Sequence, residues 1–191
     1  MKNLLSTNKL LIIPALTAVS TLLLFIAGNT ANILLWTTPW LVLNVGTIVF
    51  AFTFFWKDLI QKKMGRNFAI VNNIIASALV LLLSIEIGIV SGDVGFVWAA
   101  LLLCSFASTS IAETIDSFIY ARIKGNIKPA LISNSISVPI DTAIFSYFGF
   151  YLVLGMPVQI VLGLAVAQML VKFTLAGLIS PLLRFVNRTA V

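Results

Sequence analysis

Apolar residues follow one another along this chain in six long runs, and short segments containing glycine, proline and polar residues separate the runs. A helix that crosses a hydrocarbon core about 30 Å thick needs roughly 20 apolar residues. The runs therefore predict six transmembrane helices, at about 10–28, 40–60, 67–90, 97–120, 130–153 and 157–183. Because these spans take up nearly the whole sequence, we expect an all-α integral membrane protein, a six-helix bundle forming a single domain over residues 1–191.

The first run, from Leu10 to Ala27, follows Lys2 and Lys9 and can also be interpreted as a cleavable signal peptide. Its apolar part is longer than the core of a typical signal peptide, and the later runs are similarly apolar. We therefore expect a retained first helix.

Positive charges are distributed unequally between the two sides of the predicted bundle. The connectors on one side contain no lysine or arginine. The other side holds Lys2, Lys9, Lys57, Lys62, Lys63, Arg66, Arg122, Lys124, Lys128, Arg184 and Arg188. By the positive-inside rule, we expect both termini in the cytoplasm and a multi-pass protein of the cytoplasmic (inner) membrane.

Composition supports the bilayer as the main partner and excludes several other classes. The chain is 60% hydrophobic and only 9% charged, which would make a water-soluble domain aggregate. Its net charge of +6 is spread over short connectors, so we expect no nucleic-acid partner. Histidine is absent and Cys104 is the single cysteine, so we expect no intrachain disulfide, metal site or cofactor. Assembly into a homo-oligomer is left open by these residues.

Four ionisable residues lie deep inside the predicted spans: Glu113, Asp116, Asp141 and Lys172. A charge at the centre of a membrane helix costs about 3 kcal/mol on insertion scales. Such residues persist only where something compensates them. They are therefore the first candidates for a functional site.

Further polar residues share helix faces with these charges. Asn134 precedes Asp141 by two turns, and Gln168 precedes Lys172 by one turn. In the second predicted helix, Phe54 and Asp58 lie one turn apart on a polar face, although Asp58 is close enough to an interface to reach headgroups or water. Polar faces at similar depth predict that these helices meet around a common site.

Two interpretations of the charges remain open at this point. In the first, Lys172 only pairs with Asp141 or Glu113 and holds helices together. Pairing alone leaves two carboxylates uncompensated, because Glu113, Asp116 and Asp141 face one lysine. These two carboxylates then need a proton, water or a ligand. In the second interpretation, the acids and nearby aromatic residues line a cavity for a small solute.

The chain resembles the queuosine precursor transporter family, also called the vitamin uptake transporter family, in four stretches. These are FAFTFFWKDLIQKKMG (50–65), ASTSIAETIDSFIYARIKG (107–125), NSISVPIDTAIFSYFGF (134–150) and AQMLVKFTLAGLISPL (167–182). The residues similar to family motif positions are Asp58, Asp116, Asp141 with Thr142, and Lys172. Departures are Glu113, where glutamine is usual, and Gln61 and Gln168, where acids occur, which leave the substrate within the family open.

The resemblance implies uptake of 7-deazaguanine bases, the precursors of queuosine in transfer RNA. A carboxylate can accept the adjacent N–H groups of a guanine-like edge, and Lys172 or Gln168 can donate to its carbonyl. The candidate binding residues are Asp116, Asp141, Lys172, Glu113, Asn134, Gln168, Phe54 and Asp58. Phe106, Phe145 and Tyr147 are further candidates for stacking on the ring.

The expected mechanism is secondary transport, with protonation of Glu113, Asp116 or Asp141 as a means of coupling. The chain has no Walker phosphate-binding loop, so it does not itself hydrolyse ATP in that way. A substrate-binding subunit energised by a separate ATPase is the first alternative. A lipid-headgroup enzyme and a pore-forming subunit are others. Asp116 with Ala121 and Arg122 matches only part of a phospholipid-synthesis signature, and we expect no enzyme activity.

Overall fold

The computed structural model describes residues 2–29, 34–38, 41–91, 95–125 and 127–181. The α-helices are α1 (Lys2–Asn29), α2 (Val45–Met64), α3 (Arg66–Ser91), α4 (Phe96–Arg122), α5 (Lys128–Phe145) and α6 (Val158–Ile179). A π-helical segment, η1 (Ser146–Val153), continues α5. The predicted helical bundle is confirmed.

Four helical stretches are long and apolar enough to cross a membrane, namely Arg66–Ile89, Phe96–Arg122, Lys128–Val153 and Val158–Ile179. A shorter apolar stretch, Ile12–Gly28, lies within α1. The α2 helix has 20 residues but carries charged side chains along its second half. At about 1.5 Å per residue, this helix is still about as long as a hydrocarbon core is thick.

The predicted start of the second helix at about residue 40 is wrong. Two short strands, β1 (Leu34–Thr38) and β2 (Leu41–Asn44), pair antiparallel before α2 begins, with Thr38 opposite Leu41. The strands are built largely from leucine, valine, threonine and tryptophan, and Pro39 lies between them in the sequence. Proline interrupts helices and β-branched and aromatic residues favour strands, whereas hydropathy alone does not separate the two structures.

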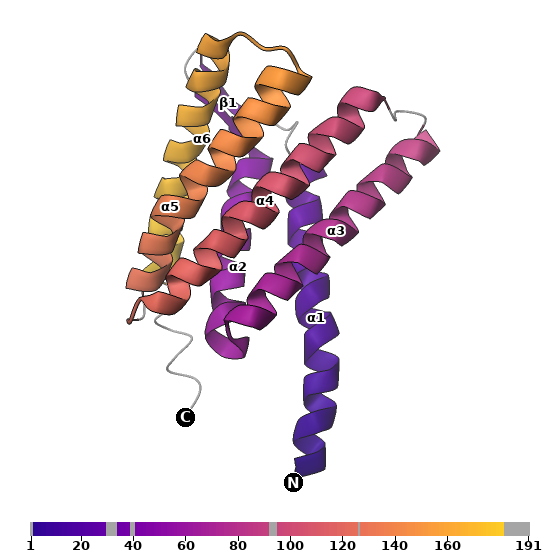
Figure 1. Ribbon diagram of the computed structural model, residues 1–191, viewed down its shortest axis with the longest axis vertical. Helices are drawn as coiled ribbons and strands as arrows, with labels where there is room; N and C mark the ends of the chain where they lie inside the picture. Colours follow the sequence, from indigo (N-terminus) through magenta and orange to yellow (C-terminus); the bar gives the residue numbers. More distant parts are fainter. Residues whose placement is uncertain (1, 30–33, 39–40, 92–94, 126, 182–191) are drawn as a thin grey trace.

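The helices form two flanks around a central pair. Figure 1 shows α5 and α6 on one side, α1 and α3 on the other, and α4 in front of α2 between them. The α4 helix packs against both α3 and α5, while α2 packs against α1, α3 and α6. The N-terminal end of α1 and the α2–α3 and α4–α5 connections lie toward the same end of the bundle (Figure 1). The side of the membrane that this end faces stays a prediction.

Polar side chains fill much of the interior, and large apolar side chains cover the outside. Ser117, Ser133 and Ser137 are fully buried, whereas the Leu178 side chain is 69% exposed. Small residues let membrane helices approach closely, and lipid replaces the apolar core that a soluble protein would need. This inverted pattern is typical of a protein whose outer surface contacts hydrocarbon.

Hydrogen bonds tie α1, α2 and α3 together on one flank. Asn72 of α3 accepts a hydrogen bond from Thr17 at 2.8 Å and donates one to Ser20 at 2.8 Å, both in α1. The Trp56 indole of α2 donates to the same Ser20 hydroxyl at 3.1 Å. Because hydrocarbon offers no competing partners, these bonds help to set how the three helices pack.

Candidate functional site

A cavity of about 330 Å³ lies among α1, α2, α3, α4, α5 and α6. Its walls come from the end of α1, the start of α2 and the first half of α4, so it occupies the half of the bundle away from the α2–α3 connection. The polar and aromatic side chains on its walls are Phe25, Phe50, Ser77, Ser84, Trp98, Ser105, Phe106, Ser108, Thr109, Asp141, Phe145, Gln168 and Lys172. The cavity therefore combines flat aromatic surfaces with hydrogen-bonding groups.

A buried ion pair between α5 and α6 forms part of the cavity wall. Lys172 Nζ donates to Asp141 Oδ2 at 2.7 Å and to the Thr142 hydroxyl at 3.4 Å. The same ammonium group lies 5.0 Å from the centre of the Phe50 ring, a cation–π distance. Asp141 and Lys172 are both buried. The pairing expected for Lys172 is thus with Asp141.

A second buried group of charges centres on Lys57 of α2. Lys57 Nζ lies 2.7 Å from Glu113 Oε2 and 3.8 Å from Asp58 Oδ1, and it donates a hydrogen bond to Asp116 Oδ2. Only 5% of Lys57 is exposed. We call Lys57, Asp58, Glu113 and Asp116 the Lys57 cluster.

Lys57 therefore lies inside the bundle and not in a connector, where the sequence had placed its charge. Its side chain turns inward because Lys57 is three residues after Phe54 and four before Gln61, on the buried face of α2. This helical spacing is the signal that could have identified it. As a result, the buried acids face two lysines, not one.

Neighbouring polar groups hold the Lys57 cluster in place. The Ser137 hydroxyl of α5 donates to Asp116 Oδ1 at 3.1 Å, and the Asn134 side chain lies beside Asp58. Gln61 Nε2 donates to the Ser117 carbonyl at 2.8 Å. Small residues on α4 and α5 allow this approach, since Ser117 and Ser137 are fully buried where the two helices meet.

The candidate residues from the sequence divide between the two groups. Asp141, Lys172 and Gln168 line the cavity. Asp58, Glu113, Asp116 and Asn134 belong to the Lys57 cluster or contact it. Phe54 is buried and packs edge-on against Phe50, with ring centres 5.2 Å apart. Glu113 interacts electrostatically with Lys57, Asp141 and Lys172, and so links the two groups.

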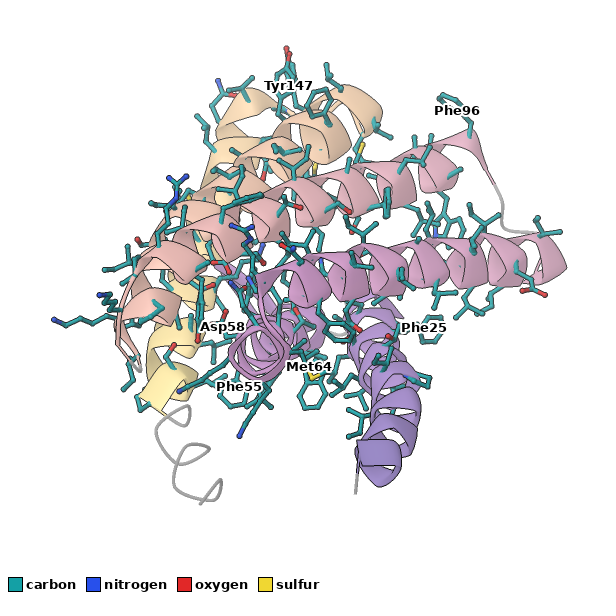
Figure 2. The ribbon with its side chains drawn as sticks, turned by 60° about the horizontal axis from the view of Figure 1, so that its bottom comes forward. Phe25, Phe55, Asp58, Met64, Phe96 and Tyr147 are labelled. Atoms are coloured by element: carbon teal, nitrogen blue, oxygen red, sulfur yellow. The ribbon has the colours of Figure 1, made fainter. Side chains whose placement is uncertain are left out.

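The aromatic candidates divide into residues that line the cavity and one that does not. Phe106 and Phe145 line the cavity, and Phe50 and Trp98, which the sequence did not single out for binding, do so as well. Tyr147 does not line this cavity, is 52% exposed and points away from the bundle in Figure 2, whereas Asp58 lies among the helices. The prediction that Tyr147 stacks on a ligand in this cavity is therefore wrong. Tyr147 is the second residue of the π-helical segment that continues α5.

Taken together, the cavity and the Lys57 cluster contain four of the chain's six acidic residues and two lysines. Such a buried arrangement suits recognition of a polar solute that can exchange hydrogen bonds with these groups. The sequence profile of the family described as "Putative vitamin uptake transporter" matches residues 44–186. This chain belongs to the vitamin uptake transporter family. No curated protein and no solved structure matches it.

Family membership and the apolar helices make this vitamin uptake transporter a multi-pass membrane protein with a small-molecule substrate. The matched region begins just before α2 and includes α2 to α6, so it contains the Lys57 cluster and the Asp141–Lys172 pair. The α1 helix lies outside the match, although Leu24 and Phe25 contribute to the cavity wall. The resemblance inferred from the four sequence stretches is confirmed.

Proposed function

We propose that this transporter imports 7-deazaguanine bases, the precursors of queuosine, as a secondary carrier of the cytoplasmic membrane. The observation that supports this most strongly is the Asp141–Lys172 ion pair in the wall of an aromatic cavity. An ion pair can exchange its internal hydrogen bond for bonds to a polar ligand. A purely structural pair would not need a cavity beside it.

The chemistry of the cavity matches a flat base with one hydrogen-bonding edge. Asp141 can accept the adjacent N–H groups of a guanine-like edge, and Lys172 or Gln168 can donate to the ring carbonyl. The rings of Phe50 and Phe106 offer surfaces for stacking. A volume of about 330 Å³ is at the small end of ligand pockets, which favours a single base over a large nucleoside conjugate.

The proposed orientation places both termini in the cytoplasm and treats residues 1–191 as one transport domain. The cavity then lies in the outer half of the bundle, and the Lys57 cluster lies between it and the cytoplasm. A base entering from outside would displace Lys172 from Asp141 before it could pass inward. Release requires the helices around the Lys57 cluster to separate, as alternating access demands.

A cell-based rescue tests the substrate. Cells that lack both synthesis of the base and their own importer receive this chain and a low external concentration of a 7-deazaguanine, and queuosine in transfer RNA is measured. The chain should restore the modification. Asp141→Asn and Lys172→Met should reduce it more than about 30-fold, because breaking a buried charged hydrogen bond costs about 2–5 kcal/mol.

The controls remove exposed charges of the same kind. Glu86→Gln and Lys63→Met alter exposed residues outside the site and should keep full rescue. An inserted, folded wild-type chain that gives no rescue would reject this substrate. Purified protein in vesicles separates a secondary carrier from a subunit of an ATPase-driven system, because only the carrier accumulates the base with an ion gradient and no second protein.

A further inference from the structure

Three of the four buried acids are held directly by a lysine, and Asp58 is not. Glu113 lies 2.7 Å from Lys57, which also donates to Asp116, and Asp141 lies 2.7 Å from Lys172. The Asp58 carboxylate is 3.8 Å from Lys57, beyond hydrogen-bonding distance, and only 1% of the residue is exposed. Asp58 therefore has the weakest compensation of the four.

Within the described part of the chain, Asp58, Gln61 and Asn134 each carry a buried acceptor atom without a hydrogen-bond partner. The atoms are Asp58 Oδ1, Gln61 Oε1 and Asn134 Oδ1. Gln61 is on the same face of α2 as Asp58, and the Asn134 side chain lies beside Asp58. These three atoms are acceptors, and the unpartnered Ser117 hydroxyl can donate to one of them at most. A buried acceptor left unpaired costs about 1–3 kcal/mol.

Rotating the Gln61 amide does not supply a donor for these acceptors. The Gln61 amino group is held by the Ser117 carbonyl at 2.8 Å, so exchanging its nitrogen and oxygen would place two oxygens against each other. A proton on Asp58 would convert one carboxylate oxygen into an O–H donor for the neighbouring amide acceptors.

The surrounding charges also favour a bound cation as small as a proton. The charged and titratable groups facing Asp58 are Lys57 of α2 and Glu113 and Tyr120 of α4, while α5 contributes the uncharged Asn134. Four ionised acids against two lysines leave two negative charges in the membrane interior. Lys57 already occupies the space between the acids, so a proton compensates without displacing its ammonium group.

We propose that Asp58 binds the proton that couples substrate transport to the proton gradient. This inference rests on the carrier function proposed above, and it selects Asp58 over Glu113, Asp116 and Asp141. When Asp58 is protonated, Lys57 compensates only the charges of Glu113 and Asp116. Because Glu113 also interacts with Asp141 and Lys172, the change reaches the pair at the cavity.

The test uses the purified full-length chain in liposomes, with a labelled 7-deazaguanine and a trapped pH indicator. One assay measures accumulation driven by an acidic exterior, and the other measures exchange of the base at equal pH and equal concentration on both sides. The wild type should perform both and acidify the interior. Asp58 does not line the cavity, so Asp58→Asn should keep exchange but lose accumulation and acidification. Glu86→Gln should behave as the wild type.

Other outcomes overturn the inference in distinguishable ways. Proton-driven accumulation by Asp58→Asn at the wild-type level would remove Asp58 from coupling, and accumulation by the wild type with a sodium gradient at equal pH would replace the proton. A folded wild type with neither exchange nor accumulation rejects the proposed function, and the inference falls with it.

A second variant keeps the inference testable if Asp58→Asn does not fold. Gln61→Leu removes an acceptor for the Asp58 O–H group, so half-maximal accumulation should require a pH lower by about half a unit to one unit. An unchanged pH profile in this variant would contradict a proton on Asp58. A loss of rate at every pH, without a shift, would show a structural role only and would also count against the inference.

Discussion

Replacing Lys57 with methionine removes the ammonium group at the centre of the Lys57 cluster and keeps most of the aliphatic stem. In the native protein this group contacts Glu113 and Asp116, which are almost completely buried. No other lysine or arginine in the described part of the chain forms an ion pair with either acid. The substitution therefore leaves two carboxyl groups in the membrane interior without their direct partner.

The expected loss follows from the burial of these groups. Removing one partner of a buried ion pair destabilises a protein by about 3–5 kcal/mol, because the remaining charge stays desolvated. We expect Lys57→Met to lower the free energy of unfolding by about this amount. Adding Glu113→Gln and Asp116→Asn to Lys57→Met removes the stranded charges, and the amide oxygen introduced by Asp116→Asn can still accept the Ser137 hydroxyl. We therefore expect the triple variant to recover most of the lost stability.

Unfolding by sodium dodecyl sulfate in mixed micelles measures these differences, with the fluorescence of the chain's 4 tryptophans as the signal. Lys63→Met is the matched control, because Lys63 is exposed in the last turn of α2. Its free energy of unfolding should stay within about 0.5 kcal/mol of the wild type. A loss below about 1 kcal/mol in Lys57→Met, or no recovery in the triple variant, would refute the inferred role of Lys57.

Two further predictions concern the cavity and the helix contacts. Phe50→Leu should weaken binding of the base about tenfold, because it removes both a stacking surface and the cation–π contact with Lys172. The dissociation constant of the base measures this change. The control Tyr147→Leu should leave that constant unchanged. Asn72→Leu should lower the free energy of unfolding by about 1 kcal/mol, from two interhelical hydrogen bonds at about 0.6 kcal/mol each. The same unfolding assay measures this change. A loss above about 3 kcal/mol, or none, would contradict the hydrogen-bond account.

Much of the helical architecture was predictable because hydropathy is a local property. The predicted bounds 67–90 and 97–120 are close to Arg66–Ser91 and Phe96–Arg122 in the structure. The predicted end of the last helix at 183 falls outside the described residues, and α6 ends at Ile179. The hairpin before α2 was missed because its residues are as apolar as those of a membrane helix. Local pairing between Leu34–Thr38 and Leu41–Asn44 then decided the structure.

The sequence by itself determined which helices carry costly polar groups, since Glu113, Asp116, Asp141 and Lys172 fall inside apolar runs. It did not determine which group compensates which. Lys57 resembles a cation at a helix end until the packing of α2 against its neighbours turns it toward Glu113 and Asp116. Pairing between helices depends on rotation and depth, which are set by contacts among distant residues. Only the tertiary structure could therefore show that Asp58 is the acid without direct compensation.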